Sequence, residues 1–249
     1  MTPTLTLDDD GVATIRLNRP QHLNRLHRED LQVLRQQFAV LAVEPRARVL
    51  VLTGQGRVFC AGFHIGELDG ADDPRLFETT VEALEALALP SIARLNGSLY
   101  GGATDLALAC DFRVGVRGME LRMPAARLGL HYYASGLQRY ITRLGLPAAK
   151  RLFLLAEAVP AEALQALGYL DELVDADALD AAVARLVHAL AANAPLAVRG
   201  MKQSLNELAR GAADPARLDE RIERCAASED LREGRAAFAQ RRAPVFRGR

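Results

Sequence analysis

The chain has 249 residues, its 31 Lys and Arg residues balance 31 Asp and Glu residues, and half of its residues are hydrophobic. A chain of this length and hydrophobicity is not disordered and forms one large domain, or one domain with an appendage. The balanced charge gives no basis for nonspecific binding to nucleic acid or to a membrane surface.

The first 116 residues alternate strand patterns, glycine-rich turns and helix patterns. Residues 4–17 alternate apolar and polar positions around an Asp-Asp-Gly turn, which predicts a β-hairpin. Apolar spacings of three and four predict a helix over 28–43, and the apolar run 49–54 predicts a buried strand. The same criteria predict a helix at 74–89, a strand at 91–97, a small helix within 100–109 and a strand at 111–116. This order of elements is typical of an α/β fold.

From about residue 134 onward the sequence is rich in Ala, Leu and Arg, and we predict that it is nearly all helical. The predicted helices cover 147–156, 161–167, 177–193, 196–210, 214–226 and 229–241. The Asn-Ala-Pro sequence at 193–195 predicts a division into a core of residues 1–193 and a helical region of residues 194–249. We expect this region to pack on the body or on another subunit, with Lys202 on a helix surface.

The three cysteines, Cys60, Cys110 and Cys225, form no metal-binding spacing and no disulfide framework. We therefore expect no structural metal, and free thiols suit a reducing compartment. The first residues lack the basic and apolar segments of a signal peptide, and no apolar run approaches 18 residues. These observations predict a cytoplasmic protein that does not span a membrane.

Two glycine-rich turns, 60–66 and 97–105, each follow a predicted strand. Glycine lets the backbone approach a ligand closely, and the first turn of a helix presents unpaired N–H groups. Two such turns could direct two N–H groups at one oxygen and form an oxyanion hole. From the spacing alone, ordinary tight turns are the simpler interpretation, and neither turn matches a phosphate-binding loop.

Six sequence blocks, in order along the chain, resemble the crotonase superfamily of enoyl-CoA hydratases and isomerases. The blocks read IRLNRPQHLN (15–24), VLVLTGQGRVFCAGFHIGEL (49–68), ARLNGSLYGGATDLALACDFRVG (93–115), MPAARLGL (123–130), APLAVRGMKQSL (194–205) and SEDLREGRAAFAQRRAPVFRGR (228–249). The resemblance implies a crotonase-like α/β fold, a spiral of ββα units with a C-terminal helical region used in trimer packing. It also implies an acyl-CoA thioester as substrate, no metal or other cofactor, and a homotrimer or a hexamer built from two trimers.

The resemblance assigns the oxyanion hole to the main-chain N–H groups of Phe63 and Gly102. It places Asp105 and Ala125 where the family's hydratases carry two glutamates. Asp105 remains a candidate catalytic carboxylate, although its side chain reaches about 1.5 Å less far than a glutamate. Its alternative role is to cap N–H groups at the start of its helix. Since alanine transfers no proton, Ala125 places efficient hydration in question.

The loop after Ala125 carries His131, Tyr132 and Tyr133. We expect His131 to be a further acid/base candidate and the two tyrosines to contact substrate, since His and Tyr both exchange protons or hydrogen bonds. The alternative is that all three only form the wall of the pocket. The other residues that the resemblance places at the substrate are Arg25, Ala61, Gly62, His64, Ile65 and Gly101.

We therefore predict an enoyl-CoA hydratase-like enzyme that stabilises a thioester enolate and adds water to a 2-enoyl-CoA in fatty-acid or related acyl-CoA metabolism. The alternatives are a double-bond isomerase that uses one carboxylate and an acyl-CoA-binding homologue with impaired catalysis. A serine hydrolase is disfavoured because Ser98 does not lie in a nucleophile elbow. RNA binding is disfavoured because the predicted helix 28–43 contains two arginines and no lysine.

Overall fold

The computed structural model describes residues 1–67 and 73–249. A six-stranded sheet with the order β1-β2-β3-β4-β6-β9 forms its centre. The hairpin β1–β2 is antiparallel, and every other neighbouring pair in this sheet is parallel. The strands are β1 (Thr4–Leu7), β2 (Val12–Leu17), β3 (Val49–Gly54), β4 (Ser91–Leu95), β6 (Phe112–Val116) and β9 (Glu172–Val174).

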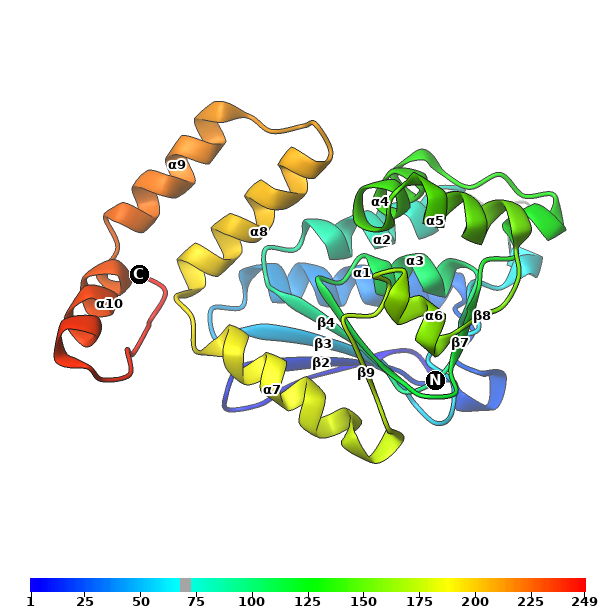
Figure 1. The fold of residues 1–249 in the computed structure, drawn as a ribbon, viewed down its shortest axis with the longest axis horizontal. Coiled ribbons are helices and arrows are strands. Elements are labelled where there is room, and N and C mark those ends of the chain that lie inside the picture. Colours follow the sequence, from blue (N-terminus) through cyan, green and yellow to red (C-terminus); the bar gives the residue numbers. More distant parts are fainter. Residues whose placement is uncertain (68–72) are drawn as a thin grey trace.

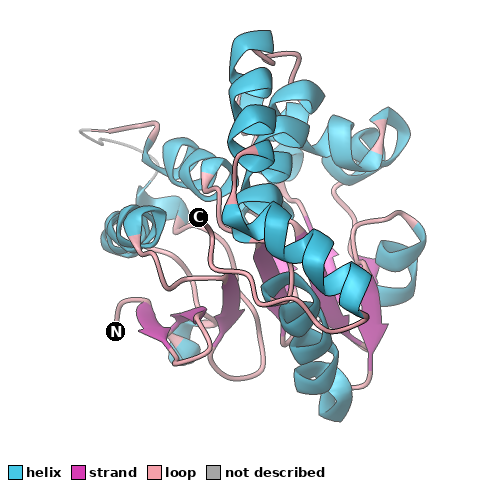
Figure 2. Ribbon diagram, turned by 90° about the vertical axis from the view of Figure 1, so that its left-hand side faces the viewer, coloured by secondary structure: helices cyan, strands magenta, loops and turns pink. Residues whose placement is uncertain are grey.

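Helices lie on both faces of this sheet (Figure 1, Figure 2). Helices α1 (Arg28–Val43), α2 (Leu76–Ala86) and α3 (Gly102–Leu108) lie on one face, and α7 (Leu179–Ala191) lies against the other. Strand β3 is therefore buried at all six positions, as expected for a parallel strand covered on both sides. The remaining helices are α4 (Ala134–Leu144), α5 (Leu146–Lys150), α6 (Ala161–Ala166), α8 (Pro195–Ala209), α9 (Pro215–Ala226) and α10 (Glu229–Gln240).

A second, three-stranded sheet has the order β5-β7-β8. It contains β5 (Leu99–Tyr100), β7 (Glu120–Arg122) and β8 (Val159–Pro160). Strand β5 ends directly before the glycines at 101 and 102, and the Gly101 N–H donates to the Arg122 carbonyl oxygen at 2.9 Å. This small sheet therefore fixes the second glycine-rich turn in place.

The prediction of a hairpin, a helix over 28–43 and a strand over 49–54 is confirmed. The prediction that the chain is nearly all helical from residue 134 is wrong at two places, because β8 and β9 interrupt the helices. Strand β9 has only three residues and pairs in parallel with β6 at the edge of the main sheet. So short a run shows no periodicity of its own, and its pairing depends on a sheet already present. Residues 151–155 form a π-helical turn, which divides the predicted helix 147–156.

Helices α8, α9 and α10 extend from one end of the sheet layer (Figure 1). The expectation that Lys202 lies on a helix surface is wrong, because its ammonium group is buried. It lies 2.8 Å from the Leu89 carbonyl oxygen and 2.7 Å from a carboxylate oxygen of Asp111. This contact attaches α8 to the body, while the division of the chain at residue 193 stays a prediction.

Among the described residues, no single helix is long and apolar enough to cross a membrane. The segment Ala176–Ala191 and α8 reach the required length only as a pair, and that pair is bent by 104°.

Asn24 connects the loop before α1 to the turn that follows β3. Its side-chain amide donates to the carbonyl oxygens of Gln55 and Val58, each at 2.8 Å, and of Phe59 at 3.2 Å. Its oxygen accepts the Arg19 N–H at 3.0 Å. Its φ of 55° lies in the left-handed region, which Asn tolerates better than most residues. The two N–H groups of one buried side chain thus serve three loop carbonyls, with one N–H shared between two of them.

We expect Asn24→Asp to lower the free energy of unfolding by about 3 kcal/mol or more, because a carboxyl group of the same shape faces these carbonyls without donors. The matched control is Asn193→Asp, which changes an exposed side chain with one hydrogen bond and lowers stability by less than about 1 kcal/mol. Urea unfolding of the two variants measures the difference. Equal losses in both would contradict the structural role of Asn24.

Candidate active site

The two glycine-rich turns meet at one end of the second sheet. Cys60 forms an isolated bridge with Leu99, and the Tyr100 N–H donates to the Cys60 carbonyl oxygen at 3.0 Å. Gly62 has a φ of 91°, and a Cβ there would lie 2.6 Å from the Tyr100 carbonyl oxygen and 3.5 Å from the Gly102 nitrogen. The two turns are therefore in direct contact, and only glycine fits at position 62 without strain.

Phe63 and Gly102 line the same cavity. Their neighbours are engaged in backbone hydrogen bonds, since the Gly62 carbonyl accepts from Leu26 and the His64 N–H donates to Leu26. By contrast, neither the Phe63 nor the Gly102 N–H donates to an acceptor within residues 1–67 and 73–249. Gly102 is the first residue of α3, where N–H groups have no partner inside the helix. The pair is suited to a carbonyl oxygen that gains negative charge.

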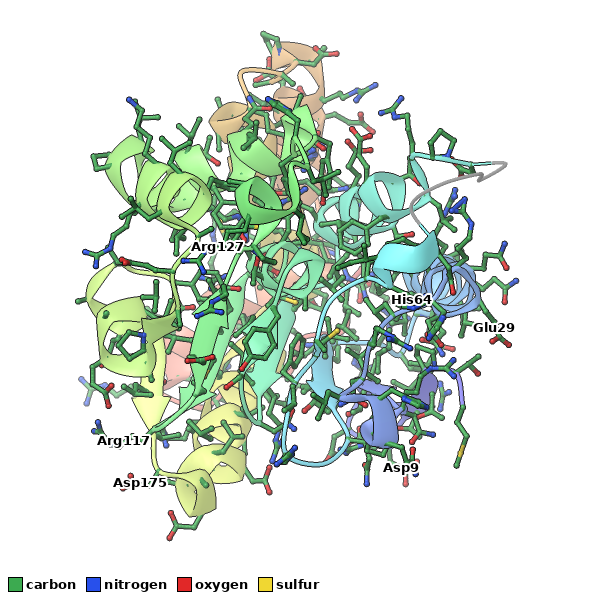
Figure 3. The ribbon with its side chains drawn as sticks, turned by 90° about the vertical axis from the view of Figure 1, so that its right-hand side faces the viewer. Asp9, Glu29, His64, Arg117, Arg127 and Asp175 are labelled. Carbon is green, nitrogen blue, oxygen red and sulfur yellow. The ribbon has the colours of Figure 1, made fainter. Side chains whose placement is uncertain are left out.

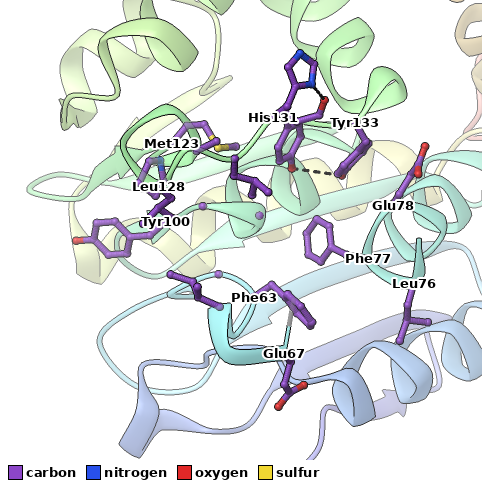
Figure 4. A pocket seen from close by; sticks show the side chains of 18 of the residues that line it. Phe63, Glu67, Leu76, Phe77, Glu78, Tyr100, Met123, Leu128, His131 and Tyr133 are labelled. Carbon is purple, nitrogen blue, oxygen red and sulfur yellow. Dashed lines mark hydrogen bonds between the residues drawn. The ribbon is translucent and has the colours of Figure 1, made fainter. Parts of the chain in front are cut away.

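The cavity beside these amides has a volume of about 330 Å³ and mainly apolar walls (Figure 4). The Phe77 ring lies against Gly102, where an added Cβ would be 2.5 Å from the ring. Ring centres are 5.9 Å apart between Phe63 and Phe77 and 6.2 Å apart between Phe77 and Tyr133. The other large apolar side chains in the wall come from Ile65, Leu76, Met123, Leu128 and Leu130. Such a cavity favours an apolar ligand group.

Charged side chains that line the cavity already have partners. Arg28 donates to the carbonyl oxygens of Glu67 and Asp73, at 3.4 and 2.5 Å. Glu78 pairs with Arg75 at 2.9 Å. Glu67 accepts the Arg28 N–H at 2.9 Å. Of these, Arg28 is the cation that could meet an anionic part of a ligand.

Asp105 is fully buried and does not line the cavity. One carboxylate oxygen lies 2.6 Å from Arg139 Nη1, and the other accepts the hydrogen bond of the Tyr133 hydroxyl. Tyr133 does line the cavity, and its ring stacks on that of Tyr132 with centres 4.3 Å apart. The Tyr132 hydroxyl donates to the Tyr133 hydroxyl at 3.3 Å, as a dashed line marks in Figure 4. Tyr133 thus connects the cavity to the buried carboxylate.

Burial raises the pKa of the Tyr133 hydroxyl far above its ordinary value, and the charge of Asp105 and their hydrogen bond raise it further. Burial also acts to lower the pKa of Arg139, but its charge and hydrogen-bond interactions with Asp105 raise it overall. At neutral pH, therefore, Tyr133 keeps its proton and Arg139 keeps its charge.

Arg139 belongs to a larger group of paired charges. It lies 2.8 Å from a carboxylate oxygen of Glu85, and Glu85 also pairs with Arg143 at 3.2 Å and with Arg210. These residues come from α2, α4 and the end of α8, and they connect three helices to Asp105 in α3. We call Glu85, Asp105, Arg139, Arg143 and Arg210 the buried charge network.

The structure brings most of the sequence-predicted site residues to the cavity. Ten of them line it: Ala61, Gly62, Phe63, Ile65, Gly101, Gly102, Ala125, His131, Tyr132 and Tyr133. Asp105 reaches it through Tyr133, and Arg25 and His64 are not among its lining residues. His131 is exposed, and its Nδ1 lies 2.8 Å from the Tyr132 carbonyl oxygen, so the ring turns away from the glycine turns (Figure 4).

His64 lies beside α1 (Figure 3). Its ring is 4.8 Å from that of His27, and its Nδ1 is 3.4 Å from a Glu67 carboxylate oxygen. His27 Nδ1 is 2.5 Å from the same oxygen. This trio is the group in the described residues that could hold a metal ion. Since Glu67 also accepts the N–H at the start of α1, a helix-capping role accounts for its position.

Sequence reasoning missed Phe77, Arg28, Arg139 and Glu85. Phe77 and Glu85 belong to a helix that the apolar periodicity does predict, but periodicity does not show which residues face a ligand. Arg139 is one of many arginines in the second half of the chain, and no local pattern distinguishes it.

Comparison with known proteins agrees with this arrangement. The family model described as enoyl-CoA hydratase/isomerase matches residues 8–249. A 2,3-dehydroadipyl-CoA hydratase of Escherichia coli is 31% identical and is aligned over 100% of both chains. An enoyl-CoA isomerase/hydratase of Mycosarcoma maydis is 30% identical, over 100% of this chain and 97% of that protein. The crystal structure of an enoyl-CoA hydratase from Bacillus anthracis is similar over 100% of both chains, with a TM-score of 0.91 and 28% identity.

The buried charge network leads to a prediction about stability. We expect Glu85→Gln to lower the free energy of unfolding by about 3 kcal/mol, because it leaves the three arginines of the network with Asp105 as its one negative charge. As a control, Glu157→Gln removes one partner of an exposed pair with Arg151, 2.9 Å apart, and lowers stability by less than about 1 kcal/mol. Urea unfolding measures both values, and a Glu85→Gln loss as small as that of the control would refute the network's structural role.

Proposed function

Because the chain belongs to the enoyl-CoA hydratase/isomerase family, we propose that its cavity binds the acyl group of a CoA thioester, with the thioester carbonyl at the Phe63 and Gly102 amides. The protein is an acyl-CoA enzyme of the hydratase/isomerase type. The observation that carries the site assignment is the pair of unused amides at the wall of an apolar cavity. Each such donor stabilises developing oxyanion charge by about 3–4 kcal/mol.

The proposed reaction is the addition of water to a 2-enoyl-CoA. Polarisation of the thioester carbonyl makes Cβ electrophilic, and an enolate forms when the water oxygen attacks. Protonation at Cα completes the addition. Apolar walls fit the hydrocarbon part of an acyl chain, and the Escherichia coli relative is named as a hydratase. The resemblance to the family implies no cofactor, so we propose that the thioester is the only small molecule required besides water.

Double-bond isomerisation is the second candidate, and Ala125 favours it. Ala125 lines the cavity where the family's hydratases carry the second glutamate, and Asp105 is connected to the cavity only by Tyr133. A single proton-transferring path suffices to move a proton between Cα and Cγ, whereas hydration must also hold and activate a water. A homologue that binds acyl-CoA without turnover is the third outcome of the assay below.

We assign the remaining substrate contacts by position. Arg28 is the one Lys or Arg side chain among the described residues that line the cavity, so we assign it to the CoA part. Arg25 and His64 lie outside the lining and would contact only the CoA part. His131 would contact substrate at the exposed edge of the cavity. The three free cysteines agree with a cytoplasmic location, which we propose as well.

Helices α8 to α10 carry several large apolar side chains that are exposed. They are Met201, Leu205, Leu208, Ile222 and Phe238, the last 88% exposed. We propose that these side chains pack between subunits in a homotrimer, or in a hexamer of two trimers.

We expect sedimentation equilibrium to give a mass three or six times 27.1 kDa. Replacing Phe238 with Asp should shift the mass toward that of the single chain, because a charge cannot be buried there unpaired. A single-chain mass for the unaltered protein would contradict the assembly.

The proposed function is tested with trans-2-enoyl-CoAs and 3-enoyl-CoAs of increasing chain length, with products identified by mass spectrometry and chromatography. Addition of one water supports hydration, and an isomer without added water supports the second candidate. Binding without conversion of any substrate would refute both.

We expect Gly62→Ala to lower kcat/KM by about 100-fold or more, since its methyl group would meet the Tyr100 carbonyl oxygen and separate the two turns. Gly200→Ala is the matched control, because a Cβ there meets only side-chain atoms at 3.7 Å or beyond, on α8. Full activity of Gly62→Ala would show that the two turns do not form the oxyanion hole.

A further inference from the structure

We propose that the Tyr133 hydroxyl is the group that exchanges protons with the bound substrate, and that Asp105 acts only through it. The proposal rests on the proposed function, because it assumes an acyl-CoA in the cavity. In the family's hydratases two glutamates stand at the positions of Ala125 and Asp105. The proposal names Tyr133 as the residue that transfers protons in their place.

Access from the cavity favours Tyr133 over Asp105. Asp105 has no exposed surface, and both of its carboxylate oxygens are occupied, one by Arg139 and the other by Tyr133. A substrate atom in the cavity therefore meets the tyrosine oxygen before it can meet the carboxylate. The tyrosine hydroxyl thus lies between the shorter aspartate side chain and the cavity.

The hydrogen bonds at the Tyr133 hydroxyl have a defined direction. A carboxylate only accepts, so the Tyr133 proton points toward Asp105. The Tyr132 hydroxyl donates to the same tyrosine oxygen. A hydroxyl oxygen has two lone pairs, which leaves one for a hydrogen-bond donor in the cavity. The resting arrangement can therefore accept a proton from the cavity while passing its own proton inward.

Several other titratable groups that line the cavity are engaged with other partners. Glu78 is paired with Arg75, and Glu67 with His27. The Tyr100 hydroxyl donates to Glu120 at 3.0 Å. His131 is exposed and bonded to a main-chain carbonyl. Among the described lining residues, Tyr133 is the one with a direct hydrogen bond to a buried carboxylate.

The step balances in hydration. As the water oxygen bonds to Cβ, the water proton moves to the Tyr133 oxygen and the Tyr133 proton moves to Asp105. The electron pair of the C=C bond passes into the enolate held by the two amides. The protons then return along the same path, so that Cα receives one from Tyr133 and Asp105 becomes a carboxylate again. No oxidant or second substrate is needed.

The test follows proton transfer directly, as exchange of the α-protons of butanoyl-CoA with D₂O. This exchange requires the enolate and the proton path but no double bond and no water addition. We expect Tyr133→Phe and Asp105→Asn each to lower the exchange rate by about 100-fold or more. Because the two residues form one path, the double variant should be within about 3-fold of the slower single variant. The Kd of butanoyl-CoA, from calorimetry, should change by less than about 3-fold in each.

Tyr140→Phe is the matched control for loss of a buried phenol. Its hydroxyl bonds to Thr104, next to Asp105 in the chain, and it does not line the cavity. We expect this variant to exchange the α-protons of butanoyl-CoA at the wild-type rate per folded molecule. An exchange rate of Tyr133→Phe within about 3-fold of the wild-type rate would overturn the proposal. So would a double variant whose rate loss equals the product of the two single losses. A larger rate loss in Tyr132→Phe than in Tyr133→Phe would overturn it as well.

The outcomes also separate this proposal from the proposed function. A wild-type protein that exchanges α-protons but converts no enoyl-CoA would refute the proposed reactions and leave the role of Tyr133 standing. A wild-type protein that binds butanoyl-CoA and exchanges no α-proton would overturn the role of Tyr133.

Discussion

The buried carboxylate of Asp105 is the constraint on which the rest of the site depends. A charge with no exposed surface is stable only when it is paired and hydrogen-bonded. Asp105 meets this requirement with Arg139 on one oxygen and Tyr133 on the other. Arg139 in turn is compensated by Glu85. The position of one carboxylate in α3 therefore fixes a side chain in α2 and one in α4, as well as the tyrosine that precedes α4.

This pairing also determines the shape of the cavity. Tyr133 is held by Asp105 and stacks on Tyr132, whose ring lies 5.2 Å from that of Phe153. Phe77 fills the space between Tyr133 and Phe63 and touches Gly102. An aromatic row thus runs from the charge network to the amide of the first turn. The amides, the apolar wall and the proton-bearing hydroxyl are positioned by one connected set of contacts.

The sequence predicts most of the frame, because long apolar periods and glycine turns are local signals. The helix over 28–43 and the strand over 49–54 follow from such patterns, and the resemblance identifies the two amides. Strand β9 could not be predicted, since three residues carry no period and their pairing partner is distant in the chain. The burial of Lys202 and the ion pair of Arg139 depend on carbonyls and carboxylates that only the folded chain brings near. For the same reason, Asp105 could be recognised as a candidate, but its separation from the cavity by Tyr133 could not.

The absence of a carboxylate at position 125 and the burial of Asp105 have a common chemical consequence. The inner wall of the cavity becomes apolar, with a phenol as its proton-bearing group. Burial raises the pKa of the Tyr133 hydroxyl, and the nearby Asp105 charge raises it further, so the phenol alone is a weak acid and its anion is not formed at neutral pH. It therefore cannot serve as a base by first losing its proton to solvent. It can take a substrate proton only if its own proton leaves at the same time, and the Asp105 carboxylate, which accepts its hydrogen bond, is in place to receive that proton. Burial thus separates the Asp105 carboxylate from the cavity, and it also makes proton transfer by Tyr133 depend on that carboxylate.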